Sequence, residues 1–204
     1  MKRTVIVLVA LALLLGACGE SDSGDPGPAA DGAGTGTAPP TSTTKPTTTT
    51  RTAKTGSSAD AMAAAMLELI TKDNTFGGGP PPFTEYLIQT RLDPTAGDPM
   101  AQPGTTELRP LTEAERAAIE AVVTPFGPIR WIEDPADWRT DDLMPVVDGS
   151  VILGVGEPAI DGASALVPIS LWCSGLCGTW FTYQLNLSAD GWTVTGIDGP
   201  IAIS

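Results

Sequence analysis

The fold is decided by residues 163–197, which read ASALVPISLWCSGLCGTWFTYQLNLSADGWTVTGI. Runs rich in β-branched and aromatic residues alternate here with short turns, a pattern typical of antiparallel strands joined by hairpins. Asp190-Gly191 is a strong hairpin turn between the last two runs. In the final run Trp192 and Val194 alternate with threonines, which predicts one buried and one wetted face. Together with an apolar run just upstream, this stretch predicts strands over residues 151–156, 163–173, 178–186 and 192–197.

A first helix is predicted well upstream of these strands. Ser57 and Asp60 are suited to its N-terminus, and apolar residues recur after them at helical spacing. The helix should end near Asn74, because the glycines and prolines of residues 77–82 cannot continue it. The apolar residues that define its buried face are Met62, Met66, Leu69 and Ile70.

A second helix is predicted to begin at a capping box. Thr112 can accept a hydrogen bond from the N3 amide, and Glu115 can reach back to the N-cap amide. Ile119, Val122 and Val123 form its apolar stripe, and the sequence Pro-Phe-Gly at residues 125–127 stops it. Short strands are expected near residues 86–92 and 129–132.

Helices followed by a run of strands predict an α+β fold. We expect two helices packed on a mainly antiparallel β-meander, formed by residues 59–204. A cone-shaped fold of the nuclear-transport-factor-2 type is one candidate for this arrangement.

The first seventeen residues are typical of an export signal. Lys2 and Arg3 form a positive start, and residues 5–15 are an unbroken apolar run. Eleven helical residues span about 16 Å, which is short of a hydrocarbon core of about 30 Å, so we predict a signal peptide over residues 1–17 and not a transmembrane helix. An ordinary secretory signal, cut near Ala17, is the alternative to the lipoprotein signal described next.

The sequence Leu-Gly-Ala-Cys at residues 15–18 resembles the lipobox of bacterial lipoproteins. This resemblance covers about the first twenty residues and implies cleavage before Cys18 and acylation of its thiol by chains such as palmitate. One acyl chain binds a membrane weakly, and two or three hold a protein firmly. We therefore expect a lipid anchor at Cys18 and a location on the outer, extracytoplasmic face of the cell membrane.

Residues 18–58 are predicted to be a disordered tether. They are dominated by Gly, Ala, Ser, Thr and Pro and contain no Val, Ile, Leu, Met or aromatic residue. Such a segment has too little apolar surface to offset the entropy of ordering. The folded domain is expected over residues 59–204.

Charge and composition exclude several classes of function. The chain has 24 acidic and 11 basic residues, a net charge of −13, and residues 59–204 carry twenty acidic against six basic groups. Nucleic-acid binding is therefore not expected, since it depends on Lys and Arg. The chain has no histidine, which removes Ser-His-Asp and Cys-His catalysis and His-ligated metals. No cofactor is predicted.

Cys173 and Cys177 bracket a three-residue hairpin loop. Paired strand ends bring Cα atoms within reach of a disulfide, and an exported domain lies where disulfides persist. We predict a structural disulfide between these two residues. A reversible thiol pair and a zinc site are the alternatives. A reversible thiol pair is disfavoured because no basic residue follows Arg139 to lower a thiol pKa. A zinc site is disfavoured because two thiolates without histidine do not supply four ligands.

Two other groups of residues are candidate sites. Trp172 and Trp180, near the hairpin with Phe181 and Tyr183, are expected to be core or cross-strand residues, or else a surface on which a ligand stacks. The acidic residues of 133–142 are expected to be a solvated loop, with Ca²⁺ binding as the alternative. A carboxylate and tyrosine enzyme would need several of a set of five residues in one pocket: Tyr86, Asp137, Asp141, Asp142 and Tyr183.

No catalytic set emerges from the sequence, so a non-catalytic binding or accessory module of the cell envelope is the leading interpretation. Its partner would be a protein or a small molecule. The alternative is a hydrolase or lyase that works through carboxylates and tyrosine. Residues 165–204 are similar to uncharacterised exported bacterial domains, a resemblance that carries no activity across.

Overall fold

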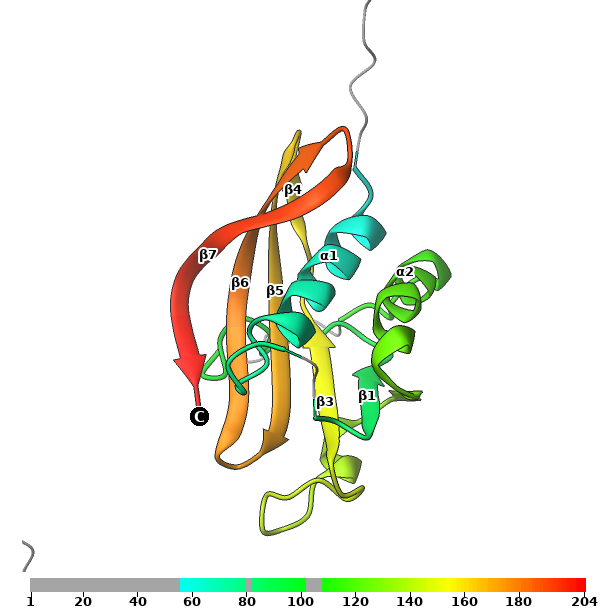
Figure 1. Ribbon diagram of the computed structural model, residues 1–204, viewed down its shortest axis with the longest axis vertical. Coiled ribbons are helices and arrows are strands. Elements are labelled where there is room, and N and C mark those ends of the chain that lie inside the picture. The colour runs from blue at the N-terminus through cyan, green and yellow to red at the C-terminus, as the bar shows by residue number, and fades with distance from the viewer. Residues whose placement is uncertain (1–55, 80–81, 102–107) are drawn as a thin grey trace, which may run out of the picture. The chain divides into compact units, whose positions relative to one another are not determined.

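The computed structural model describes residues 56–79, 82–101 and 108–204 (Figure 1). Residues 1–55, which hold the predicted signal peptide, Cys18 and nearly all of the predicted tether, lie outside the described residues. The helices are α1 (Ser58–Thr71) and α2 (Glu113–Val123), with short 3-10 helices at Thr124–Phe126 and Pro135–Trp138. The strands are β1 (Glu85–Gln89), β2 (Ile129–Ile132), β3 (Ser150–Val155), β4 (Ala159–Asp161), β5 (Ser164–Ser174), β6 (Cys177–Ser188) and β7 (Gly191–Ile203).

The seven described strands form one sheet in the order β2-β1-β3-β5-β6-β7, with the short β4 also paired to β5. From β3 onward the pairing is antiparallel, whereas β1 lies parallel to both β2 and β3. The chain passes from β1 to β2 through α2, since parallel neighbours need a crossover connection. The predicted α+β class is therefore confirmed, with a sheet that is mainly antiparallel and partly parallel. The nuclear-transport-factor-2 type of cone stays a prediction.

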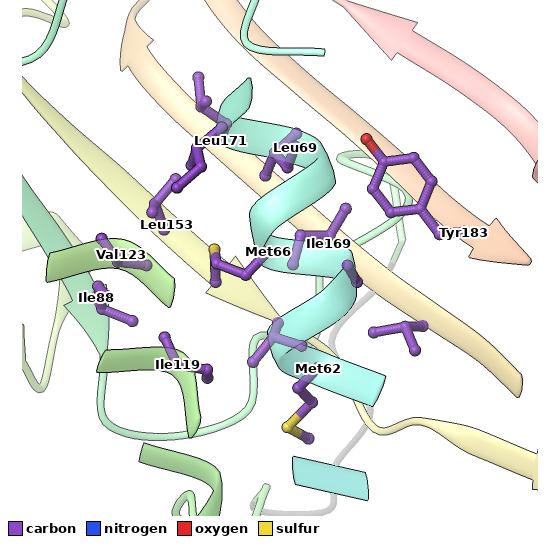
Figure 2. Packing of buried hydrophobic residues seen from close by; sticks show 14 of the residues in the cluster. Met62, Met66, Leu69, Ile88, Ile119, Val123, Leu153, Ile169, Leu171 and Tyr183 are labelled. Carbon is purple, nitrogen blue, oxygen red and sulfur yellow. The ribbon is translucent and has the colours of Figure 1, made fainter. Parts of the chain in front are cut away.

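Both helices cover the same face of this sheet (Figure 1). α1 packs on α2 and on β5, β6 and β7. Its inward residues Met62, Met66 and Leu69 are fully buried, and they meet Ile88, Leu153 and Ile169 of the sheet and Ile119 and Val123 of α2 in one core (Figure 2). The helical spacing of the apolar residues of α1 thus forms the face that joins helix to sheet.

The predicted starts of both helices are confirmed, whereas α1 ends at Thr71, three residues before the predicted end near Asn74. The Ser57 hydroxyl accepts a hydrogen bond from the Asp60 amide at 3.1 Å. Thr112 and Glu115 form a capping box in which each side chain accepts from the backbone amide of the other. α2 passes at Val123 into the 3-10 turn that contains Pro125 and ends at Gly127.

The sheet differs from the prediction in three places. β4 was not predicted, because its three residues are all exposed and have no alternation to mark them. β7 continues past residue 197 to Ile203, with irregularities in its register against β6. β1 ends at Gln89, and Leu92 lies in the segment after it.

Candidate functional site

The predicted disulfide is present at one end of the sheet. Cys173 and Cys177 are joined, with their Cα atoms 5.1 Å apart, where β5 turns into β6. We call this region the disulfide end. At the other end of β6 lies the β6–β7 turn, beside which Gly56 sits against the Trp192 indole so closely that a Cβ at Gly56 would overlap it. We call that region the Gly56 end.

A hollow of about 560 Å³ opens at the disulfide end, and we call it the disulfide-end hollow. Its lining comes from segments that are far apart in the chain. These segments are the loop after α1, the residues before β1, the loop before β3, the β5–β6 hairpin and the end of β7. The lining residues are Thr75, Phe76, Pro82, Phe83, Met144, Asp148, Gly149, Ser150, Cys173, Ser174, Leu176, Cys177, Ile203 and Ser204.

Large apolar side chains stand exposed around this hollow. Leu176 is 91% exposed, Ile203 66%, Phe76 56% and Met144 52%. Single exposed apolar residues are ordinary, whereas larger contiguous apolar patches are a feature of interaction surfaces in general. Because these four residues come from four different segments, the surface exists only in the folded domain.

The segments that carry these side chains are held by hydrogen bonds. The Phe76 amide donates to Asn74 Oδ1 at 3.0 Å, and the Phe76 ring meets Phe83 edge to face with centroids 5.7 Å apart. The Gly175 amide in the hairpin donates to the Leu143 carbonyl at 2.8 Å. Gly178 and Ser204 exchange two backbone hydrogen bonds, which fix the end of β7. The hollow is therefore preformed in this structure.

Few polar groups face the hollow. Ser150 is 1% exposed, and its hydroxyl has no hydrogen-bond partner in the described chain. Asp148 supplies a carboxylate, and no Lys or Arg is among the lining residues. The Thr75 hydroxyl lies 3.6 Å from Cys177 Sγ. The hollow is thus mainly apolar, and Asp148 is the one charged side chain among its lining residues.

A second hollow, of about 460 Å³, lies toward the Gly56 end, where β4, β5, β6 and β7 meet. Ile160, at 37%, is the one exposed large apolar residue among those that line it. Gln184, Asn186 and Thr195 give it a polar wall. It lacks the convergence of apolar side chains seen at the disulfide end.

Trp172 and Trp180, the candidates for stacking on a ligand, lie on the sheet face opposite the helices. Trp172 is 7% exposed and packs with Leu87, Ile132 and Ile152, and Trp180 packs against this cluster half-buried. The Arg139 guanidinium lies over the Trp172 ring, 4.5 Å from its centroid. Burial lowers the pKa of Arg139, against the opposing effect of nearby carboxylates. A ligand could stack on this face of Trp172 only if Arg139 moved.

The same face holds a buried polar cluster that the sequence did not indicate. The Ser170 hydroxyl donates to Asp93 Oδ2 at 2.6 Å, and the Thr95 amide and hydroxyl both donate to Oδ1 at 2.8 Å. Gly154 leaves the room for this cluster, since a Cβ there would meet the tips of Asp93, Ser170 and Gln89. A glycine within the β3 run was the one available signal.

The structure does not bring the candidate enzyme residues together. Asp137, Asp141 and Asp142 are exposed in the segment between β2 and β3. Burial raises the pKa of Tyr86 to about 12, and its hydroxyl has no partner among the described residues. Tyr183 donates to Asp73 Oδ2 at 2.7 Å, and burial, followed by this bond, raises its pKa well above the ordinary value. None of the five lines either hollow.

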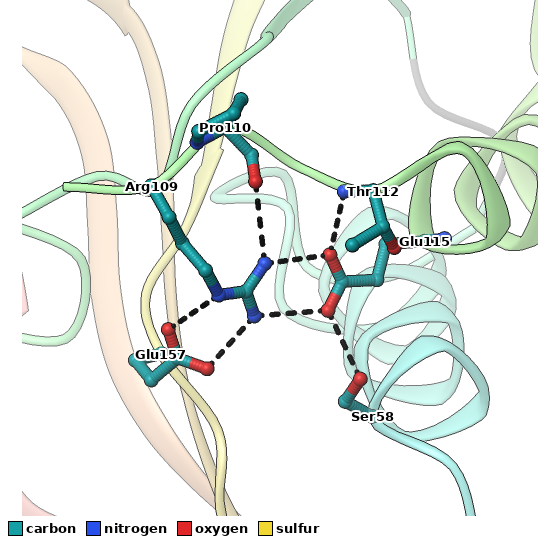
Figure 3. Close-up of polar contacts among 6 residues, drawn as sticks. All are labelled: Ser58, Arg109, Pro110, Thr112, Glu115 and Glu157. Atoms are coloured by element: carbon teal, nitrogen blue, oxygen red, sulfur yellow. Dashed lines mark hydrogen bonds and ion pairs between the residues drawn. The ribbon is translucent and has the colours of Figure 1, made fainter.

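The Gly56 end is closed by a network of charged and polar side chains (Figure 3). Arg109 donates to Glu115 at 2.8 and 3.0 Å and to Glu157 at 2.8 and 2.9 Å. The Ser58 hydroxyl of α1 donates to Glu115 at 2.9 Å. Burial alone would raise the pKa of Glu115, but the hydrogen bonds from Arg109, Thr112 and Ser58 outweigh it and lower the pKa to about 2. This network ties α1, α2 and the segment after β3 together.

Comparisons with known proteins add no assignment. A scan against models of protein families, a search of curated proteins and a search of solved structures each found no match. Across residues 56–79, 82–101 and 108–204 no helix has the length and apolar character needed to cross a membrane. The same residues contain no group of three or more acidic or cysteine side chains placed to hold a metal ion.

Proposed function

We propose that this chain is an exported lipoprotein, anchored through Cys18, whose folded domain binds a partner through the disulfide-end hollow. The anchor is supported by the charged start, the short apolar run and the Leu-Gly-Ala-Cys sequence of residues 15–18. The binding role is supported by the convergence of Phe76, Met144, Leu176 and Ile203 on one preformed hollow. That convergence is the observation that carries the proposal.

The position of the hollow agrees with a role in binding. β6 runs from Cys177 at the disulfide end to the turn beside Gly56, and its 12 residues span about 36 Å. The chain that precedes Gly56 therefore enters the domain at the end remote from the hollow. A domain held through that chain could present its hollow to a partner away from the point of attachment.

The scattered positions of the carboxylates and tyrosines favour binding over catalysis. General acid and base catalysis needs two groups within reach of one substrate. Tyr183 is committed to Asp73, and Tyr86 is enclosed in the core. The acidic residues of the loop before β3 lie in solvent.

The anchor can be tested by the mass of the mature protein. In a bacterial host that processes lipoproteins, we expect the mass of residues 18–204 with added acyl chains, found in the membrane fraction. Cys18→Ser should remove the acyl mass. An unmodified chain that begins after residue 17 in the wild-type protein would show an ordinary secretory signal and overturn the anchor.

The binding role can be tested by photocrosslinking on intact cells. A photoreactive amino acid at Leu176 should give discrete adducts, whereas the same group at Asp190, exposed in the β6–β7 turn, should not. Equal labelling from both positions, or none from Leu176, would contradict the proposal. Both positions are exposed, so neither substitution should disturb folding.

A further inference from the structure

We infer that the occupant of the disulfide-end hollow is an apolar peptide segment of a partner protein, flanked by Lys or Arg. This inference rests on the proposed function and adds the chemistry of the partner. The hollow of about 560 Å³ lies within the range of known ligand sites, roughly 300–1,000 Å³. Its apolar lining suits a few buried apolar side chains, which act as anchors in protein interfaces.

The hollow is built to bind without reorganising. The Cys173–Cys177 disulfide closes the hairpin, and the Gly175 amide joins that hairpin to Leu143. The Thr84 amide donates to the Gly149 carbonyl at 2.8 Å and holds the wall that carries Ser150. Ordering the receptor therefore costs little on binding, which favours a partner that brings only a short segment.

Charge indicates what flanks the apolar segment. Asp148 lines the hollow. Asp141 and Asp142 are not among its lining residues, but they are exposed in the segment that leads to Met144, which does line it. No Lys or Arg lines the hollow, and residues 59–204 carry twenty acidic against six basic groups. Basic residues beside the apolar segment would meet an acidic margin and gain in both rate and specificity of association.

Other occupants fit less well. Residues 19–55 of this chain contain no Val, Ile, Leu, Met or aromatic residue, so they have no side chain to fill an apolar hollow. In a contact between two copies of this chain, the acidic residues of one copy would face those of the other, and like charges oppose such a contact. An anionic membrane surface would be repelled for the same reason.

The test uses the mature chain, residues 18–204 with Cys18→Ser, exported behind an ordinary secretory signal so that the disulfide forms. The probes are three fluorescein-labelled peptides, KKLAFLGIKK, EELAFLGIEE and KKSAGSGSKK, whose affinities are measured by fluorescence anisotropy. We expect the first to bind at least tenfold more tightly than either other. Its advantage over the second should shrink as salt screens the charges.

Variants locate the binding. Leu176→Ser and Met144→Ser should each weaken binding of KKLAFLGIKK about tenfold or more, and the matched control Ile160→Ser, in the second hollow, should leave it unchanged. Asp148→Asn should reduce the preference for lysine over glutamate. Equal binding of the lysine and glutamate peptides, or no effect of Leu176→Ser, would overturn the inference.

Other outcomes separate this inference from the proposed function. Binding to vesicles of phosphatidylglycerol and phosphatidylcholine, or a dimer in sedimentation that Leu176→Ser abolishes, would replace the peptide by a membrane or a second copy. If all three peptides fail while Leu176 still gives discrete adducts on cells, the peptide chemistry is wrong and the binding role stands. If Leu176 also gives no discrete adducts on cells, both the peptide inference and the proposed binding role are wrong.

Discussion

The two ends of this sheet are organised in opposite ways. At the Gly56 end the polar groups of Arg109, Glu115 and Glu157 satisfy one another, and Ser58 brings α1 into the same network. At the disulfide end a covalent bond and backbone hydrogen bonds hold the chain, and Phe76, Met144, Leu176 and Ile203 are left exposed. The polar groups of the Gly56 end are thus paired with one another within the domain, whereas the disulfide end exposes large apolar side chains to solvent.

The contrast indicates where stability and recognition reside. Buried residues that form several hydrogen bonds within the domain, such as Glu115, should contribute to the free energy of unfolding. Residues that stand in solvent at the hollow should matter to binding and hardly to folding. The following experiments test that division, beginning with the largest expected effect.

Replacing Glu115 should cause the largest loss of stability. Glu115→Ala removes a carboxylate that is 2% exposed, together with its bonds to Arg109, Thr112 and Ser58. Arg109 is 37% exposed and keeps Glu157 as a partner, so no unpaired buried charge is left behind. The lost charge-assisted hydrogen bonds and the lost capping box should together cost about 3 kcal/mol in the free energy of unfolding, which urea denaturation would measure. The control is Lys72→Ala, which breaks an exposed i,i+4 pair with Glu68 and should cost about 0.5 kcal/mol or less. Equal losses of stability in Glu115→Ala and Lys72→Ala would contradict the special contribution of Glu115.

Acid should weaken the Gly56 end through the same residue. The pKa of Glu115 is about 2 in the folded domain against an ordinary value of 4.5. Its contribution to stability is therefore complete above pH 4.5 and is lost as the pH falls toward 2. The folded and unfolded states thus differ in their affinity for this proton by an amount equivalent to roughly 3 kcal/mol in the free energy of unfolding.

Urea denaturation at a series of pH values would measure this slope. Glu115→Gln has no carboxylate to titrate, so its stability should change less over the same range. A slope from pH 5 to pH 2 that is identical in the variant and the wild type would show that other groups cause it.

Removing the disulfide should have a smaller effect. Cross-linking a loop of five residues lowers the conformational entropy of the unfolded chain, which stabilises the folded state by about 2 kcal/mol at 25 °C. The double variant Cys173→Ala with Cys177→Ala should therefore lose about 2 kcal/mol in the free energy of unfolding. Amide hydrogen exchange should rise in the β5–β6 hairpin more than near α1. A uniform rise across the domain would mean that the bond does more than pin the hairpin.

The smallest effect is expected at the exposed apolar residues. Leu176→Ser removes a side chain that is 91% exposed, and Met144→Ser one that is 52% exposed. Each should change the free energy of unfolding by about 0.5 kcal/mol or less, as surface substitutions usually do. A loss above about 2 kcal/mol at Leu176 would show that the hollow is part of the core and would weaken its role in binding.

Local patterns explain how much of the fold could be predicted. The capping box of Thr112 and Glu115, the spacing of apolar residues in α1 and the Asp190-Gly191 turn are each complete within a few residues. The parallel pairing of β1 with β3 joins Tyr86 to Val151, and no nearby residue records that choice of partner. β4 could not be predicted either, because its three exposed residues show no alternation of apolar and polar side chains.

The site was predicted only in part. The disulfide followed from two cysteines at the ends of a short hairpin loop. The hollow beside it could not be foreseen, because Phe76, Met144, Leu176 and Ile203 come from separate loops and meet only through the sheet order. A leucine at the tip of a hairpin was the single signal, since turns seldom place a large apolar residue in solvent.

The order of elements along the chain has a consequence for folding during synthesis. α1 ends at Thr71, and the strands that it covers begin at Ser164, about ninety residues later. At roughly 5–20 residues per second, β5 is begun about 5–20 s after α1 is complete, and until then the buried face of Met62, Met66 and Leu69 lacks the strands on which it packs most. Hairpins form within microseconds, so β5, β6 and β7 can assemble as soon as they emerge and then receive the waiting helix. The strands made after α1 thus complete the core that this helix requires.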